Sequence, residues 1–284
     1  MKILILGASG LVGSRFVEMF KDKYKLITPS SKELDLTNYN QIYQYFNKKE
    51  FDYVINFAGY TNVDEAEKEK ALCLTLNENV AFSVAKLCKS ADIPHIYISS
   101  DFVFKGLKGD ITPYKEERVK KVNPLGLSWY GYTKLKGEWE TMHEGGNWNI
   151  VRISYPYRKS FNGKLDFARN ILKLYQDGTL YPLFNDQFIT PTFIDEACEA
   201  LLKIVELNKF RRIYHVASTE VTTPYEFACG LLKTHLLKVG SFTEYMKYGN
   251  KTLRTQYGGL DCTKTQKLLG MEFHSWKDSI KNLQ

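Results

Sequence analysis

Three glycines at three-residue intervals follow the first apolar segment and constrain the fold of this chain more than any other feature. Lys2–Leu6 has the apolar pattern of a buried strand, and Leu11–Phe20 has the 3.6-residue pattern of a helix. Glycines permit a tight turn and a close backbone approach, and a helix N-terminus presents amides and a positive dipole to a phosphate. A strand, a glycine turn and a helix in direct succession therefore predict a dinucleotide-binding loop. Its expected residues are Gly7, Ser9, Gly10, Leu11, Val12 and Gly13.

Strand-like and helical segments alternate through the first half of the chain. The further expected strands are Tyr24–Thr28, Tyr53–Phe57, His95–Ser99 and Asn149–Ile153. The helices expected between them are Asn40–Phe46, Glu65–Ser90 with an irregular start, and Tyr130–Met142. Strands separated by helices of this length form right-handed βαβ units. We therefore predict an α/β fold of the Rossmann type, a doubly wound parallel sheet.

The alternation loosens beyond Ser154. Helical patterns at Leu165–Gln176, Ile194–Leu207 and Pro224–Leu237 surround one short strand at Arg212–Val216. We predict a dinucleotide-binding domain at residues 1–154, with returning segments at about 186–218. Residues 155–284 are expected to form mainly a smaller, interleaved C-terminal lobe that binds the substrate.

Composition excludes several classes of protein. The chain has no apolar run of about 18 residues, and its apolar N-terminal stretch is too short for a signal peptide, so we expect a cytoplasmic protein without a membrane span. Its five cysteines are widely scattered, which argues against a zinc site or disulfide framework and fits a reducing compartment. No His, Asp or Glu group has metal-ligand spacing, so no metal is expected. The net charge of +7 comes from dispersed lysines, which suits an anionic small substrate better than nucleic acid.

Cofactor choice is expected to depend on the segment after the second strand. An acidic residue there normally binds the ribose 2′-hydroxyl of NAD. Here the segment reads Thr28-Pro29-Ser30-Ser31-Lys32, so we expect no carboxylate at that corner, and Ser30, Ser31 and Lys32 suit the 2′-phosphate of NADP. The alternative is a polar turn with helix-capping serines. We favour NADP over NAD, with Asp35 and Leu36 flanking the adenine.

A tyrosine and a lysine lie four residues apart, at Tyr130 and Lys134, and so share one face of a helix. A phenol titrates near pH 10, and a neighbouring ammonium lowers that pKa until the phenol can act as a general acid or base. This spacing alone is common. It gains weight because the pair follows the glycine loop and a strand that ends in Ser99 and Ser100. A serine at the carboxyl edge of the sheet can bind a substrate carbonyl, and we favour Ser100.

The chain resembles the extended short-chain dehydrogenases/reductases, and within them the group of the dTDP-4-dehydrorhamnose reductases. Beyond the loop and the Tyr/Lys pair, the matching segments span the whole chain. They are Asn56–Glu67, Ile98–Gly106, Val151–Ser154, Asp186–Thr192 and Gly259–Cys262.

The resemblance implies roles for single residues. It makes Ser100 the catalytic hydroxyl residue, Tyr130 the proton donor and Lys134 its partner, with both Tyr130 and Lys134 also at the cofactor. The cofactor border would include Ala58, Gly59 and Tyr60. The residues expected to face the sugar are Phe102 or Val103, and Gln187.

The implied activity is the NAD(P)H-dependent reduction of the 4-keto group of a nucleotide-linked 4-keto-6-deoxy sugar, in deoxysugar biosynthesis. The nucleotide sugar is the expected partner, and a homodimer is open. One alternative is a non-catalytic NADP-binding regulatory subunit, although the complete Ser/Tyr/Lys set argues for an enzyme. Another is an epimerase or dehydratase with tightly bound NAD. A dehydratase would carry an Asp-Glu pair after the catalytic hydroxyl residue, whereas Asp101 here is followed by Phe102.

Two departures from the family pattern lie on the substrate side. The stretch from Pro124 to Tyr130 is about two residues longer than usual. The family commonly has S-W-V-Y-G where this chain reads Ser154-Tyr155-Pro156-Tyr157-Arg158, which replaces the glycine with a cation. Arg158, Lys159 and Lys164 either meet a nucleotide-sugar diphosphate or form a solvated basic loop.

Overall fold

A central sheet of six parallel strands has the order β2-β1-β3-β4-β5-β7. The structure is a computed structural model that describes residues 1–48, 50–110, 112–117, 125–248 and 252–283. The strands are β1 (Lys2–Leu6), β2 (Lys25–Ile27), β3 (Tyr53–Asn56), β4 (His95–Ser100), β5 (Trp148–Ile153) and β7 (Arg212–His215). The order reverses direction between β1 and β3, and ligands of doubly wound folds bind at such a switch point. The predicted fold class is confirmed.

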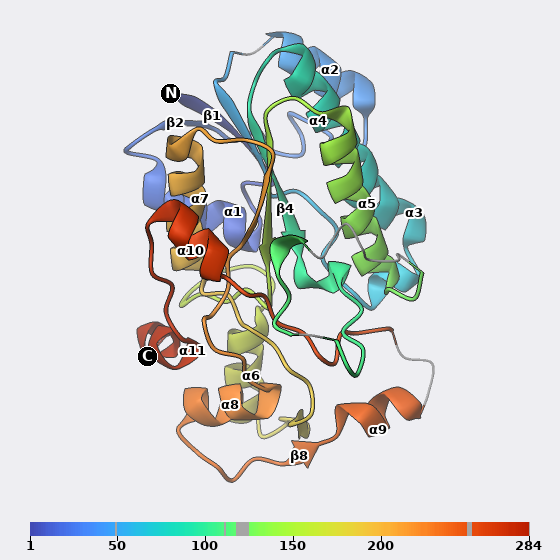
Figure 1. The fold of residues 1–284 in the computed structure, drawn as a ribbon, viewed down its shortest axis with the longest axis vertical. Helices are drawn as coiled ribbons and strands as arrows, with labels where there is room; N and C mark the ends of the chain where they lie inside the picture. The colour runs from blue at the N-terminus through green and yellow to red at the C-terminus, as the bar shows by residue number, and fades with distance from the viewer. Residues whose placement is uncertain (49, 111, 118–124, 249–251, 284) are drawn as a thin grey trace.

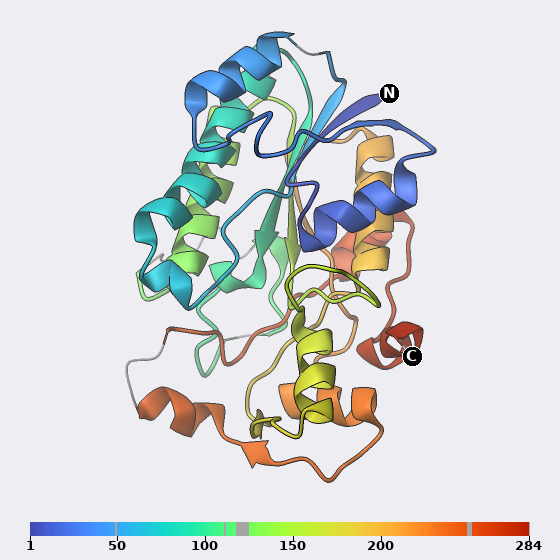
Figure 2. The same ribbon diagram turned by 180° about the vertical axis from the view of Figure 1, so that it is seen from behind.

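Helices cover both faces of the sheet (Figures 1 and 2). One layer contains α1 (Leu11–Phe20), α7 (Ile194–Leu207) and α10 (Thr263–Leu269). The other contains α2 (Tyr39–Lys48), α4 (Val80–Ser90) and α5 (Trp129–Glu144). Every residue of β3, β4 and β5 is buried between these layers, which explains why the strands read as nearly continuous apolar runs.

A smaller lobe lies beyond the carboxyl ends of the strands, in the lower part of Figure 1. It contains α6 (Phe167–Gln176), β6 (Leu183–Phe184), α8 (Pro224–Leu232), β8 (Val239–Gly240), α9 (Phe242–Lys247) and α11 (Trp276–Ser279). The chain enters this lobe after β5, returns to the sheet for α7 and β7, and leaves again for α8. The interleaving is as expected, while the domain boundary at residue 154 stays a prediction.

The expected helix at Glu65–Ser90 is divided into four pieces. They are η1 (Glu65–Glu67), α3 (Lys70–Leu74), a π-helical turn η2 (Thr75–Asn79) and α4. The helix expected to run to Leu237 ends at Leu232, because Lys233 takes a left-handed conformation with φ 53°. The expected strand at His95–Ser99 extends one residue further, to Ser100.

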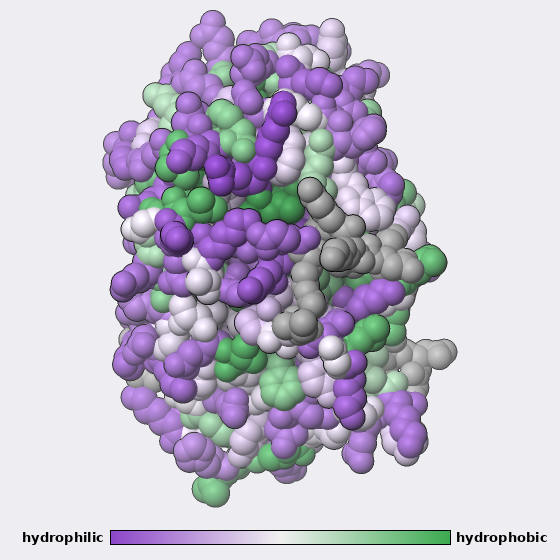
Figure 3. Space-filling view, viewed as in Figure 1, coloured by the Kyte–Doolittle hydropathy of each residue, from purple (hydrophilic) through white to green (hydrophobic). Residues whose placement is uncertain are grey.

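The surface in the view of Figure 3 is mostly hydrophilic, with apolar residues scattered between charged ones. Within the described ranges, no helix is long and apolar enough to cross a membrane. All five cysteines are free and buried.

Candidate active site

The glycine loop is folded so tightly that side chains are excluded from two of its positions. Gly7 has φ +75°, and a Cβ there would lie 2.6 Å from the backbone nitrogen of Ala58, at the end of β3. A Cβ on Gly13 would lie 2.4 Å from the carbonyl oxygen of Gly7. No side chain caps the first turn of α1 at Gly10, so its amides stay available. This cradle fits a dinucleotide diphosphate.

The other residues predicted for this loop differ in their exposure. Ser9 and Gly10 are exposed at the tip, and Leu11 and Val12 anchor the helix start by packing against the main core. Ala58, which faces Gly7, is held because its amide donates to Asn56 Oδ1 at 3.1 Å. The loop after β1 and the segment after β3 therefore meet at the switch point of the sheet.

The corner after β2 contains a carboxylate that the segment Ser30–Lys32 does not show. Glu33 Oε2 accepts hydrogen bonds from both the amide and the hydroxyl of Ser30, each at 2.8 Å. The expectation of a corner without an acidic group was therefore wrong, because the chain turns back after Lys32 and brings Glu33 onto Ser30. Ser31 and Lys32 remain exposed.

The two residues expected near the adenine differ in environment. Asp35 Oδ1 accepts from the amide and hydroxyl of Thr37, at 2.9 and 2.7 Å, which lowers the pKa of its carboxyl. Leu36 is partly buried and packs against the second hydrophobic cluster, as Ala58 does. Leu36 and Ala58 thus reach the same side of the sheet from different loops.

Helix α5 begins at Trp129 and brings Tyr130 onto the end of β4. Ser128 caps the helix by accepting from the amide of Gly131 at 3.1 Å, and Glu67 accepts from the amide of Trp129 at 2.8 Å. A Cβ on Gly131 would lie 2.3 Å from the carbonyl oxygen of Phe102, so only glycine permits this approach. The sequence signal for this contact is therefore the glycine after the tyrosine.

Tyr130 is buried, and its phenol lies near enough to Ser100 for the serine hydroxyl to affect its pKa. Burial raises the pKa of Tyr130 above its ordinary value, and the influence of Ser100 lowers it in part. The neighbouring Ser99 hydroxyl is also buried but has no hydrogen-bond partner. The geometry thus favours Ser100 over Ser99, in agreement with the sequence-based choice.

Lys134 is one turn further along α5 and is 5% exposed. Its Nζ donates to the carbonyl oxygen of Ile98 at 2.5 Å and lies 4.3 Å from the ring centroid of Tyr97. Burial lowers the pKa of Lys134 to about 7, while Glu138 on the same helix raises it in part. The Lys134 side chain therefore gains or loses its proton near neutral pH. It lies on the same face of α5 as Tyr130.

Asn77 joins the cofactor side to the catalytic helix, and sequence reasoning missed it. Its Oδ1 accepts from the amide of Tyr60 at 2.9 Å, and its Nδ2 donates to the Tyr60 carbonyl at 3.2 Å and to Thr133 Oγ1 at 3.0 Å. A Cβ on Gly59 would lie 2.8 Å from Asn77 Oδ1 and 3.6 Å from Lys134 Nζ. The signal available in the sequence was an asparagine within an apolar helical pattern, and the structure shows that this asparagine is fully buried.

The residues expected on the substrate side differ in accessibility. The ring of Phe102 lies 5.4 Å from that of Tyr130 and 6.3 Å from that of Tyr155. Val103 is fully buried in the main core, so Phe102 is the better candidate of the two. Gln187 Nε2 donates to the Tyr155 hydroxyl at 3.2 Å, which places Gln187 beside these aromatic rings.

A cavity of about 200 Å³ is lined by Phe102 and lies beside the start of α5. Its described lining includes Ser128 at the start of α5, Phe242 of α9, and the cations Lys105 and Arg254. Mixed apolar and cationic walls suit a nucleoside diphosphate. The longer stretch from Pro124 lies at this side, but Pro124 itself is outside the described residues.

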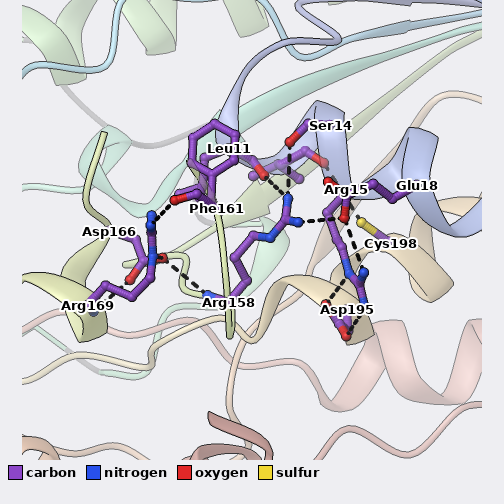
Figure 4. Close-up of polar contacts among 11 residues, drawn as sticks. Leu11, Ser14, Arg15, Glu18, Arg158, Phe161, Asp166, Arg169, Asp195 and Cys198 are labelled. Atoms are coloured by element: carbon purple, nitrogen blue, oxygen red, sulfur yellow. Dashed lines mark hydrogen bonds and ion pairs between the residues drawn. The ribbon is translucent and has the colours of Figure 1, made fainter. Parts of the chain in front are cut away.

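Arg158 does not stand in a solvated basic loop but is buried against α1 (Figure 4). Its guanidinium donates to the Leu11 carbonyl at 3.3 Å, to Ser14 Oγ at 3.0 Å and to Glu18 at 2.5 Å. Phe161 lies between Arg158 and Arg169, with its ring centroid 5.4 and 5.6 Å from the two guanidinium carbons. The loop that carries Tyr155 is thereby attached to the helix that carries the glycine loop. Lys164 is exposed.

Known proteins resemble the chain over its full length. The family model described as RmlD substrate binding domain matches residues 1–284. The spore coat polysaccharide biosynthesis protein SpsK of Bacillus subtilis is 27% identical and covers 99% of this chain and 95% of its own. The dTDP-4-dehydrorhamnose reductase of Salmonella typhimurium is 31% identical over 80% of this chain and 76% of its own.

A solved structure is similar to the chain in both fold and sequence. The dTDP-4-dehydrorhamnose reductase of Bacillus anthracis, in complex with NADP, has a TM-score of 0.86 at 27% identity. The match covers 99% of this chain and 98% of that one.

Proposed function

Because the chain belongs to the RmlD substrate binding domain family, we propose that it reduces the 4-keto group of a nucleotide-linked 4-keto-6-deoxy sugar. The chain is an NAD(P)-dependent oxidoreductase of the extended short-chain dehydrogenase/reductase type. The substrate is the part that we propose, together with a place in deoxysugar biosynthesis. The observation that supports it best is the meeting of Ser100, Tyr130 and Lys134 beside Gly59, next to a cavity with cationic walls.

The proposed chemistry assigns a task to each of the three residues. The reduced nicotinamide supplies a hydride when it is bound. Tyr130 donates its phenolic proton to the alkoxide that develops on the substrate oxygen. Ser100 donates a hydrogen bond to the same oxygen and stabilises its charge. The Lys134 ammonium lowers the pKa of the phenol and so favours release of its proton.

Two features support a reductase over the alternatives. A dehydratase needs an acid at the position of Phe102, which is instead an aromatic side chain packed on Tyr130. A binding subunit has no need of a tyrosine buried beside both a serine and a lysine. The buried relay therefore favours an enzyme that transfers a proton to a carbonyl oxygen.

A screen of nucleotide 4-keto sugars tests the proposal. The purified protein is mixed with NADPH or NADH, and oxidation of the cofactor is followed at 340 nm in the presence of dTDP-4-dehydrorhamnose and its analogues. The proposal predicts oxidation that depends on the 4-keto sugar and a product with a new hydroxyl at C4. Stoichiometric NAD that stays bound during purification would instead indicate an epimerase or dehydratase. Tight, exchangeable NADP binding without turnover of any keto sugar would indicate a regulatory subunit.

A further inference from the structure

A buried carboxyl group lies directly behind the catalytic serine. Asp101 is 2% exposed and follows Ser100 at the end of β4. The Ser100 hydroxyl donates to Asp101 Oδ1 at 3.0 Å, and the Ser154 hydroxyl donates to Asp101 Oδ2 at 2.7 Å. A chain of polar groups thus runs from Ser154 through Asp101 and Ser100 to Tyr130. None of the tasks assigned above uses Asp101.

When Asp101 is ionised, the direction of the hydrogen bonds in this series of polar groups is incompatible with the proposed reduction. A carboxylate only accepts hydrogen bonds, and a serine hydroxyl has a single proton to donate. When Ser100 donates that proton to Asp101, it has none for the oxygen of the substrate. Its oxygen can then only accept, which makes it a competitor for the proton of Tyr130. With Asp101 ionised, this arrangement therefore does not support the proposed reduction.

The charge of Asp101 acts in the same direction. An ionised Asp101 raises the pKa of Tyr130, and so opposes the loss of the phenolic proton. Tyr155, which follows β5, also feels this charge: burial raises its pKa most, and Asp101 raises it further. The cation of the site, Lys134, is held on the carbonyl of Ile98. A negative charge at Asp101 thus hinders both donors that the proposed reduction requires.

We propose that Asp101 is a positioning residue that must be neutral for the reduction, because only its neutral carboxyl group donates to Ser100 and turns the Ser100 proton toward the substrate oxygen. The inference rests on the proposed function for its catalytic part. Asp101 keeps its proton throughout the reaction. The proton that enters the product still comes from Tyr130, and Ser154 continues to donate to the second oxygen of Asp101.

The environment of Asp101 makes the neutral form accessible near physiological pH. Burial raises the pKa of Asp101 to about 6, and hydrogen bonds from Ser154, Ser100 and the amides of residues 101 and 102 offset only part of the effect. The largest influences are thus burial and hydrogen bonding rather than a neighbouring cation. The neutral form gains as the pH falls toward this value, so the reductive rate is expected to fall as the pH rises through it.

Asp101→Asn tests the inference, because an amide of the same shape donates to Ser100 and accepts from Ser154 at every pH. The measurement is kcat/KM for the keto sugar at saturating NADPH, between pH 5.5 and 8.5. We expect the variant to match the wild type at the acid end. Above the pKa of the carboxyl group, the ratio of variant to wild type should rise by up to about tenfold per pH unit. Ser99→Ala is the matched control, since it removes a buried neighbouring hydroxyl without a partner and should leave the pH profile unchanged.

A second readout does not depend on turnover or on the substrate. Carbonyl-region NMR of protein labelled with ¹³C-aspartate, with NADP bound, should show one carboxyl carbon titrating near pH 6 that is absent from Asp101→Asn. A ratio that stays constant with pH, or an Asp101 carbon that titrates near the ordinary value of about 3.9, would overturn the inference. If no 4-keto sugar is reduced, the proposed function fails, and the NMR titration still decides the state of Asp101.

Discussion

Single residues of the site are placed at the expense of stability. Lys134 is a fully charged side chain in water, but burial lowers its pKa to about 7 in the folded protein. Each pKa unit corresponds to about 1.4 kcal/mol of preference for the neutral form. Burial of Lys134 therefore lowers the free energy of unfolding. This loss disappears only at high pH, where the side chain is neutral in both the folded and the unfolded state. The proposed reduction gives a reason for this placement, since it assigns to the Lys134 ammonium the task of lowering the pKa of the Tyr130 phenol.

Lys134→Met is expected to make the protein more stable and inactive. The folded pKa lies below the unfolded one, so the unfolded state binds more protons between pH 7 and about 10.5, and wild-type stability rises with pH across this window. The increase in Tm of the variant over the wild type should therefore be larger at pH 6 than at pH 9. Thermal unfolding at the two pH values measures it. An equal or larger increase at pH 9 would contradict the assigned cause.

At the scale of elements, the π-helical turn Thr75–Asn79 is the feature that organises the site. The extra residue in this turn points Asn77 inward, where it binds the backbone of Tyr60 on one side and Thr133 of α5 on the other. The segment after β3 and the catalytic helix are thereby held together, although they are far apart in the sequence. π-helical turns often occur at functional sites.

Asn77→Ala is expected to loosen both of these elements. The loss of the four hydrogen bonds of the Asn77 side chain, in a buried position, should lower the free energy of unfolding by about 1–3 kcal/mol. It should also weaken the binding of NADPH, because Gly59 and Tyr60 are predicted to border the cofactor. Urea unfolding and titration by NADPH fluorescence measure the two effects. Asn79→Ala, in the same turn but exposed, is the control and should change neither; if both variants behave alike, Asn77 has no special role.

The parts of the site that lie within one strand or helix could be predicted from the sequence, and those that depend on a turn could not. The glycine loop and the Tyr130/Lys134 pair were predictable because they depend on spacing within one strand or helix. Asn77 was not, since a π turn changes the helical register and periodicity does not reveal it. Glu33 was not, because its approach to Ser30 depends on how the chain turns after Lys32. The choice between Phe102 and Val103 depends on one 3-10 turn, η3 (Asp101–Val103), that the strand pattern does not predict.

At the scale of the whole molecule, a contact through Arg158 joins the loop after β5 to α1. Arg158 leaves the loop of Tyr155 and binds Ser14 and Glu18 along the side of α1. Glu18 also binds Arg15, which in turn binds Asp195 at the start of α7 through two hydrogen bonds of 2.8 and 2.7 Å. Arg158, the cation that departs from the family pattern, thus connects the loop of Tyr155 to α1, the helix that follows the glycine loop.

Arg158→Gln is expected to weaken this connection. The arginine side chain is 5% exposed while that of Glu18 is 46% exposed, so the glutamate regains water when its partner is lost. The expected decrease in the free energy of unfolding is therefore about 1–2 kcal/mol, below the range for a fully buried pair. Urea unfolding measures it, with Lys164→Ala in the same loop as an exposed control. A loss no larger than that of the control would show that the contact contributes nothing to stability.

The proton transfer from Tyr130 is the central claim, and a single-turnover comparison tests it most directly. Wild type, Tyr130→Phe and the control Tyr132→Phe are mixed with NADPH and a nucleotide 4-keto sugar that the screen has identified, and the loss of absorbance at 340 nm is followed. Removing the general acid should slow hydride transfer by about 10²–10⁴-fold in Tyr130→Phe, with NADPH binding retained, and leave Tyr132→Phe near the wild-type rate. Near-normal hydride transfer in Tyr130→Phe would contradict the account.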